Sequence, residues 1–248
     1  MKSGRTTAFA GLLASSLLVS CAGSGPQLEG LAAAAQDALS ADSSPAALSV
    51  DEITRGLKAA LTTGSEAVVS QLGATDGFSS DPIIRVPLPS SLQKARGFAA
   101  KVGLEGSFDD LELKLNRAAE AATPKARDLF ISAIQSMSVS DAKGILQGPD
   151  NAATQYFRDK TGESLKEQMR PIVDQALSQV GAVNSFNQLL ERYQRIPFAP
   201  EVNADLTGHV VDEGSDGIFY YLAEEEKAIR ENPVKRTSQI LQRVFGTL

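Results

Sequence analysis

The sequence predicts an all-α protein: a single multi-helix bundle with a proline-rich strap, preceded by a disordered tether. Three observations predict this class. From Ser49 onward, apolar residues recur three and four positions apart, which is the period of an amphipathic helix. Polar and apolar residues do not alternate convincingly over five or more positions, so strands should be scarce. The chain has no Trp and only 6% aromatic residues, so aliphatic residues and Ala must fill most of the core, which suits packed helices.

A capping box formed by Ser49 and Glu52 predicts the start of the first helix. The Ser49 side chain can accept from a free amide of the first turn while Glu52 reaches back to the backbone of Ser49. An apolar stripe follows and Gly73 ends the helix; the stripe is Ile53, Leu57, Leu61, Val68 and Leu72.

Residues 75–89 are predicted to form the strap. Asp76-Gly77 favours a turn, and prolines at 82, 87 and 89 hold the chain extended. The strap is expected to cross the helical core, as a loop or as a short strand, through its apolar residues Ile83, Ile84, Val86 and Leu88.

Caps and apolar stripes predict the remaining helices. Ser107, Thr123, Ser140 and Asp150 are expected to begin four of them, Pro124 to lie in a first turn, and Pro171 to kink a long helix. Short loops and the lack of a Gly/Ser-rich break favour one domain over residues 49–248. The predicted helices cover residues 91–102, 107–122, 123–137, 140–147, 150–157, 163–180, 183–193, 205–231 and 233–245, with a connection at 197–203.

The first 20 residues have the pattern of a secretory signal peptide. Lys2 and Arg5 precede an apolar run over residues 8–19, which is shorter than the roughly 20 residues of a membrane-spanning helix. The stretch Leu18-Val19-Ser20-Cys21 resembles the bacterial lipobox, and this resemblance implies that Cys21 becomes the first mature residue and carries the lipid. The alternative is an ordinary signal peptide cut between Ala14 and Ala22, which would leave a stray thiol.

The lipobox also predicts a location. Two or more acyl chains hold a protein stably on a membrane, so the membrane is an expected partner. Ala22 stands where an aspartate would resemble an inner-membrane retention signal, so we expect an outer-membrane lipoprotein facing the periplasm. Residues 21–48 are rich in Ala, Ser, Gly and Asp, and they are predicted to be a tether because they offer too few large apolar residues to fold alone.

Charge narrows the classes of partner. Residues 1–20 hold two of the 24 basic residues and none of the 30 acidic ones, so the mature chain would carry a net charge of −8. An acidic balance disfavours binding to nucleic-acid phosphates, and no nucleic-acid partner is expected. Solubility alone accounts for such a charge.

Several stretches resemble a family of bacterial exported proteins known as domain of unknown function 4197, from about Val50 to Phe245. The resemblance implies an exported, mainly helical domain, and it brings neither an activity nor catalytic residues. The matching stretches are residues 64–67, 71–73, 85–89, 116–122, 136–146, 152–158, 216–219 and 223–230, which read GSEA, QLG, RVPLP, NRAAEAA, SMSVSDAKGIL, AATQYFR, DGIF and AEEEKAIR.

The only histidine suggests a weak metal-site candidate. His209, Asp212, Glu213 and Asp216 fall at offsets of three, four and seven, on one face of a predicted helix. Imidazole and carboxylate donors of this kind can ligate a divalent metal. The simpler interpretation is the solvated face of an amphipathic helix near its N-terminus, and no metal or other cofactor is expected.

Polar residues within the family-like stretches are the candidate binding residues. If they are buried, they must be paired or hydrogen-bonded, because an unpaired buried polar group costs several kcal/mol. Ion pairs that fix helix register, together with exposed caps, are the simpler interpretation. The six candidates are Arg85, Arg117, Glu120, Gln155, Tyr156 and Arg158.

The remaining motifs give little sign of catalysis. The run Glu224, Glu225, Glu226 with Lys227 and Arg230 is predicted to be helix surface, with Glu226 and Arg230 at the favourable spacing of four. A nucleophile elbow and a phosphate-binding loop are both missing from the sequence. The sequence does not exclude a pair of catalytic carboxylates, because such pairs have no fixed spacing in sequence.

The sequence therefore predicts a membrane-anchored envelope lipoprotein whose non-enzymatic helical domain binds another envelope component, a protein more than a small molecule. One alternative is a bundle that binds a small molecule or lipid in an apolar cavity. That cavity would be lined by strap residues 83–88 and by Phe130, Tyr156, Phe157 and Phe219. Another alternative is a metal-assisted hydrolase at His209.

Overall fold

The structure is a computed structural model that describes residues 49–231, apart from the side chain of Val102. These residues belong to one compact unit that spans residues 48–248. The predicted signal peptide, Cys21, the tether and the last predicted helix at 233–245 lie outside the described residues.

The described part of the chain is helical throughout its regular structure, and it contains no strand. This confirms the predicted all-α class. None of its helices is both long and apolar enough to span a bilayer. The elements are α2 (Val50–Leu72), α3 (Ser90–Ala99), the 3₁₀ turn η1 (Ala100–Val102), α4 (Glu105–Ala122), α5 (Lys125–Ser136), α6 (Val139–Gln147), α7 (Ala152–Gln179), α8 (Ala182–Tyr193) and α9 (Leu206–Glu231).

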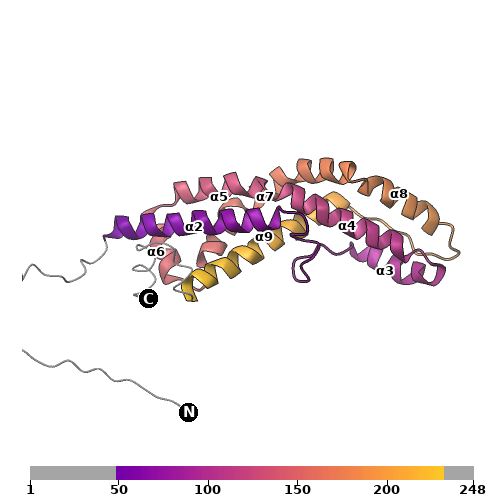
Figure 1. Cartoon of the computed structure of the whole chain (residues 1–248), viewed down its shortest axis with the longest axis horizontal. Helices are drawn as coiled ribbons and strands as arrows, with labels where there is room; N and C mark the ends of the chain where they lie inside the picture. The colour runs from indigo at the N-terminus through magenta and orange to yellow at the C-terminus, as the bar shows by residue number, and fades with distance from the viewer. Residues whose placement is uncertain (1–48, 232–248) are drawn as a thin grey trace, which may run out of the picture. The chain divides into compact units, whose positions relative to one another are not determined.

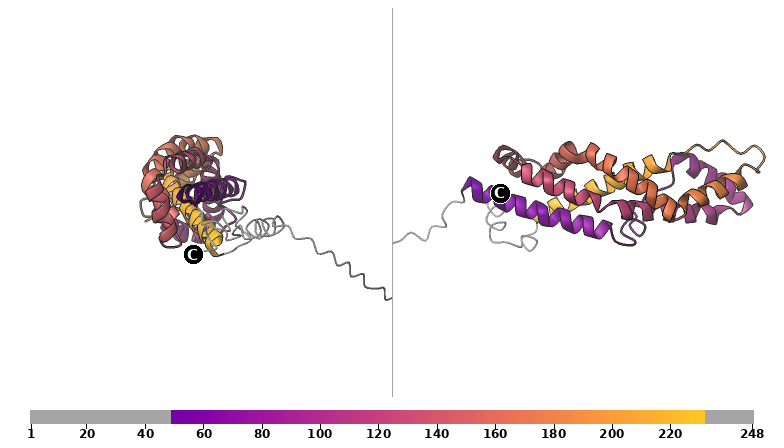
Figure 2. Two further views of the ribbon diagram at one scale, coloured as in Figure 1. Left: turned by 90° about the vertical axis from the view of Figure 1, so that its left-hand side faces the viewer. Right: turned by 90° about the horizontal axis from the view of Figure 1, so that it is seen from above.

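The bundle consists of two groups of helices, one at each end, and the long helices run through both groups (Figures 1 and 2). Helix α2 packs against α5, α6 and α9 at one end of the bundle, and α4 packs against α3 and α8 at the other. Helices α4, α7 and α9 contact one another and join the two groups. The strap connects α2 to α3, close to the place where the two groups meet (Figure 1).

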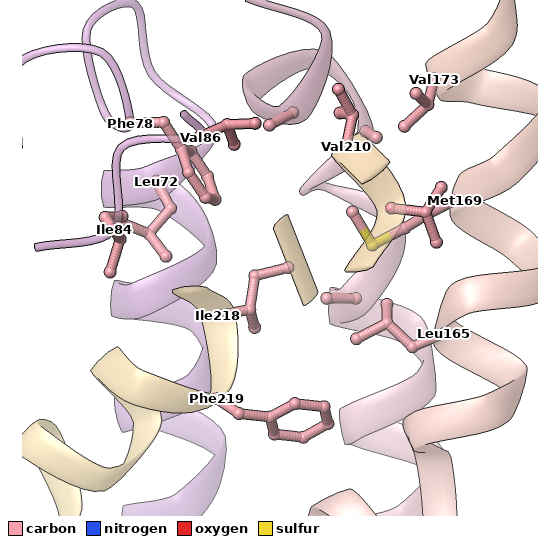
Figure 3. Packing of buried hydrophobic residues seen from close by; sticks show 14 of the residues in the cluster. Leu72, Phe78, Ile84, Val86, Leu165, Met169, Val173, Val210, Ile218 and Phe219 are labelled. Atoms are coloured by element: carbon pink, nitrogen blue, oxygen red, sulfur yellow. The ribbon is translucent and has the colours of Figure 1, made fainter. Parts of the chain in front are cut away.

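The core follows the predicted apolar stripes. In α4 all five residues predicted to face inward are buried with no exposed surface, namely Phe108, Leu111, Leu115, Ala118 and Ala122. Burying a Phe or Leu side chain contributes about 1.5–3 kcal/mol, so such a stripe is the main force that docks α4. In Figure 3, strap residues gather near the end of α2, while Ile218 and Phe219 of α9 lie further into the core.

The capping residues were predicted with mixed success. Ser49 and Glu52 do form a capping box, and Gly73 does end α2. The predicted first residues of four later helices are wrong. The observed N-caps are Leu104, Pro124, Ser138 and Asn151 in place of Ser107, Thr123, Ser140 and Asp150.

These shifts have local causes. The Ser138 side chain accepts from the Asp141 amide, and the Asp141 carboxylate accepts from Ser138 N–H, so α6 has a capping box two residues before the predicted start. Thr123 lies at the C-terminal end of α4, where its hydroxyl donates to the Ala119 carbonyl at 2.9 Å. The backbone of Thr123 is helical, with φ −53° and ψ −38°, and not extended as at a typical N-cap, so Thr123 continues α4 and does not cap α5.

Two predicted helices are one. The 28-residue helix α7 runs through Gly162 and Pro171, without the predicted break near residue 160. Its buried stripe continues across that point through Phe157, Thr161 and Leu165. Packing of this stripe outweighs the roughly 1 kcal/mol that a glycine costs inside a helix.

The strap does cross the core as a loop. Phe78, Ile84, Val86 and Leu88 are buried. Ile83 departs from the expectation, because 63% of its surface is exposed. The turn over residues 82–84 buries one of the two adjacent isoleucines and presents the other to solvent.

Candidate functional site

Helix α4 holds the strap through Asn116, whose side chain is fully buried. The Asn116 amide nitrogen donates to the Val86 carbonyl, and the Val86 N–H donates to the Asn116 side-chain oxygen, both at 2.9 Å. One side chain therefore satisfies both backbone groups of Val86, which would be costly to bury unpaired. These two hydrogen bonds fix the strap against α4.

Glu120, one turn further along α4, holds the beginning of the strap. It is 4% exposed, and its Oε1 accepts from the N–H groups of Phe78 at 3.2 Å and Ser79 at 3.3 Å. Its Oε2 accepts from Arg117 at 2.8 Å. The second arm of Arg117 reaches Asp76 at 2.7 Å.

The charges of this group support one another. A hydrogen bond from the Ser79 hydroxyl, followed by one from Arg117, lowers the pKa of Asp76. The hydrogen bonds to Glu120 and then to Asp76 raise the pKa of Arg117. Asp76 and Arg117 therefore stay charged at neutral pH, so charge-assisted hydrogen bonds hold the start of the strap.

Helix α9 holds the strap from a second side. His209 Nε2 lies 2.7 Å from the Pro87 carbonyl oxygen, and because a carbonyl only accepts, Nε2 must carry the proton. The Tyr221 hydroxyl donates to Asp81 Oδ2. Asp81 Oδ1 accepts from the N–H of Ile83 at 2.8 Å and from that of Ile84 at 3.4 Å, which fixes the turn.

The pair of Tyr221 and Asp81 is electrostatically matched. The hydrogen bond to Asp81, with burial adding to it, raises the pKa of Tyr221 to about 12. Partial burial acts to raise the pKa of Asp81, but the hydrogen bonds from Tyr221, Ile83 and Ile84 together lower it. Tyr221 therefore stays protonated and Asp81 ionised over the whole physiological range.

The strap touches α9 directly at Gly217. A Cβ atom at this position would lie 2.8 Å from Phe78 Cε1 and 3.2 Å from Ile84 Cβ. The first of these distances is shorter than real side chains tolerate, so this close approach requires glycine. The side chains of Phe78 and Ile84 thus pack directly on the backbone of α9.

The result is a fixed surface made by two elements, which we call the strap surface: Asp81, Ile83, Tyr220 and Tyr221. Ile83 is 63% exposed and Tyr220 is 38% exposed. The rings of Tyr220 and Tyr221 meet edge to face with centroids 5.4 Å apart. The strap therefore exposes an aliphatic side chain and α9 exposes an aromatic one, and Asp81 and Tyr221 link the two elements.

The structure brings together only part of the predicted binding cluster. Arg117 and Glu120 do meet, while Arg85 pairs with Glu112 at 2.9 Å. Gln155 is exposed on α7. Tyr156 donates to the Ala133 carbonyl at 3.4 Å, and Arg158 pairs with Asp216 at 2.8 Å while stacking over Phe219.

The four candidate metal ligands are engaged separately. His209 binds the strap carbonyl, Asp212 pairs with Lys166 at 2.8 Å, and Asp216 pairs with Arg158. Glu213 is exposed. Across residues 49–231, no three His, Cys, Asp or Glu side chains are grouped so that they could hold a metal ion.

The charge run over residues 224–230 is only partly surface: Glu224 and Lys227 are exposed as predicted, but Glu226 is buried. Glu226 is only 7% exposed, and its carboxylate accepts from the N–H groups of Ala153 and Thr154 at 2.9 Å each. Arg230 pairs with it at 2.9 Å and also donates to the Ile145 carbonyl at 2.8 Å. Glu226 therefore caps the first turn of α7 from α9, where a negative charge is favoured.

The predicted apolar cavity at the aromatic residues is filled by the rings themselves. Phe130 has no exposed surface, and its ring centroid lies 5.3 Å from that of Phe157 and 6.0 Å from that of Phe219. Two small cavities of about 20 and 10 Å³ are lined in part by Glu226, and Phe157 also lines the first of them. Each has room for about one water molecule.

The described residues therefore form an all-helical domain in which polar side chains hold the strap, a loop, in a fixed position. The chain belongs to the family described as protein of unknown function (DUF4197), whose model matches residues 47–246. The family predicted from the sequence is thereby confirmed. No curated protein and no solved structure matches the chain.

Proposed function

We propose that this protein is a lipid-anchored protein of the bacterial envelope whose helical domain binds another envelope protein at the strap surface, without catalysing a reaction. The observation that carries the proposal is the held backbone of the strap. Asn116, Glu120 and His209 bind this backbone directly, and Tyr221 binds the Asp81 side chain that fixes the turn. The strap exposes Ile83, and α9 exposes Tyr220.

Such a loop suits protein recognition for a physical reason. Ordering a flexible loop at the moment of binding costs about 1–2 kcal/mol for each residue whose backbone becomes fixed. The strap meets this cost when the domain folds, so contacts at Ile83 and Tyr220 contribute their full free energy to binding. A buried polar network whose members are all satisfied makes the loop rigid, which favours a single binding conformation.

The lipid anchor supports the same function. Attachment of Cys21 to a membrane and a tether over residues 21–48 would confine the domain to a thin layer of the envelope. Confinement raises the effective concentration of a partner in that layer, so a modest affinity suffices. The polar side chains around the strap are engaged in holding its backbone. This use of the side chains fits a binding surface better than a reaction centre.

In-cell crosslinking tests this function. A photo-crosslinking amino acid replaces Ile83 in the intact lipoprotein, and the matched control replaces Val139, which is 47% exposed on α6. We expect a discrete crosslinked protein from position 83 and none from position 139. The product should disappear in a Tyr220→Ala background and when Cys21→Ser removes the anchor. Equal labelling from both positions, or no product from position 83, would contradict the proposal.

A further inference from the structure

We infer that the partner segment seated on the strap surface is cationic: a protein segment in which Lys or Arg flanks an aliphatic side chain. The inference rests on the proposed function and adds the chemistry of the partner to it. It is argued from what surrounds Ile83 and Tyr220, the two exposed apolar side chains of the surface.

One stripe of α9 faces the strap along its length. His209 binds the Pro87 carbonyl, and Gly217, two turns later, touches Phe78 and Ile84. Helical spacing places Glu213 between these two positions on the same stripe. Glu224, one turn beyond Tyr220, lies close enough to Tyr221 to act on its pKa. On this face of α9, Glu213 therefore lies two turns before Tyr220 and Glu224 lies one turn after it.

These two acidic residues differ from the others nearby. Asp212 and Asp216 on the same helix are paired with Lys166 and Arg158. Glu213 and Glu224 are both exposed, and neither forms a salt bridge within residues 49–231. Asp81 adds a third negative charge, because its side-chain partner Tyr221 is neutral.

The nearby cations offset only part of this charge. Arg85 of the strap is held by Glu112, whose carboxylate also meets Arg96 at 3.4 Å. Lys227 is exposed two turns along α9 from Tyr220, as far as Glu213 lies in the other direction, so it offsets one of the three negative charges. The apolar surface of Ile83 and Tyr220 is thus bordered by Asp81, Glu213 and Glu224, in a mature chain that would itself carry a net charge of −8.

A cationic segment with an aliphatic side chain complements each part of this surface. A guanidinium or ammonium group can stack on the face of the Tyr220 ring. The same group gains charge-assisted hydrogen bonds from carboxylates that have no other partner. The aliphatic side chain covers Ile83. An acidic segment would meet like charge, which costs affinity and slows association.

Defined peptides test the inference on the full lipidated chain in neutral detergent. Three fluorescent peptides of equal length are compared by anisotropy: one alternating Arg and Leu, one alternating Glu and Leu, and one alternating Arg and Ser. We expect the Arg-Leu peptide to bind more tightly than both others. Ile83→Ser should weaken the Arg-Leu peptide selectively and leave the Arg-Ser peptide unchanged.

Charge variants complete the test. The double variant Glu213→Gln/Glu224→Gln should weaken the Arg-Leu peptide about 10-fold, a loss typical of removing close charge pairs at an interface. The matched control is Glu167→Gln/Glu191→Gln, which removes two exposed acidic residues from α7 and α8 and should change nothing. Equal weakening by both pairs would mean attraction by net charge only and would overturn the inference.

The two proposals fail in different ways. If position 83 crosslinks a protein in cells but the Gln variants neither reduce that product nor weaken the peptide, the cationic partner is wrong and the binding surface stands. If position 83 yields no specific product, the proposed function itself fails.

Discussion

Glu120 on α4 and Glu226 on α9 occupy similar settings at different places in the molecule. Each is buried, each accepts hydrogen bonds from two consecutive backbone N–H groups of another segment, and each pairs with an arginine about one turn away on its own helix. In both places a buried carboxylate thus accepts hydrogen bonds from backbone N–H groups that would otherwise be buried without a partner.

The difference lies in what the two carboxylates hold. Glu120 binds a loop, and its Arg117 extends outward to Asp76, which is exposed. Glu226 binds the first turn of α7, and its Arg230, 10% exposed in the side chain, reaches inward to the end of α6. The first cluster fixes the shape of a surface and the second fixes the junction of three helices. Similar chemistry therefore predicts different consequences on mutation.

The largest effect is expected at the helix junction. Glu226→Gln removes the charge that compensates Arg230, and it turns an amide NH₂ toward the N–H donors of Ala153 or Thr154. Breaking a buried pair in this way costs about 3 kcal/mol of unfolding free energy. Urea unfolding followed by helical circular dichroism measures the loss.

Glu224→Gln is the matched control, because it changes an exposed member of the same acidic run. It should alter the unfolding free energy by less than about 0.5 kcal/mol. If the two variants unfold at the same urea concentration, the contrast between the buried junction and the surface is wrong.

An intermediate and local effect is expected at the strap. Glu120→Gln weakens the bonds to Phe78 and Ser79, while Asn116 still holds Val86. The unfolding free energy should fall by about 1–2 kcal/mol. Hydrogen exchange should accelerate at the Phe78 and Ser79 amides and stay unchanged in the first turn of α7. Faster exchange in α7 would show that the two clusters are coupled and not separate.

The sequence was sufficient for most of the fold. Apolar residues at helical spacing mark each described helix because burial of one stripe is what docks it. Helix starts were less predictable, since Ser, Thr and Asp occur inside helices and at their C-terminal ends as well as at caps. The box formed by Ser138 and Asp141 had a readable signal, whereas Leu104 and Pro124 as N-caps had none.

The site was harder to predict because its members are distant in sequence. Arg117 and Glu120 were found as polar residues of one helix, but their strap partners are more than 40 residues away. The burial of Glu226 could have been predicted, because Glu226 continues the apolar stripe of Ile218, Leu222 and Ile229 at helical spacing. A carboxylate on an apolar stripe indicates a buried partner, and the acidic run obscured that position.

The smallest expected effect concerns the second clamp on the strap. Tyr221→Phe removes the hydrogen bond to Asp81 and should cost about 1 kcal/mol near neutral pH. The pKa of Tyr221 is raised in the folded state to about 12 from an ordinary value near 10, so this stabilisation is complete below about pH 10 and is lost as the pH rises toward 12. The pKa of Asp81 is lowered, so the stabilisation is also lost as the pH falls below about 4.

The measurement is the difference in unfolding free energy between the unmodified chain and the Tyr221→Phe variant at several pH values. That difference should be flat from about pH 5 to 9 and shrink on both sides, while the titrations of all other tyrosines cancel because both chains share them. A difference that stays constant to pH 12 would mean that Tyr221 is not bound to an ionised Asp81. In that case α9 would hold the strap only through His209 and the contact at Gly217, and the position of Ile83 would depend chiefly on α4.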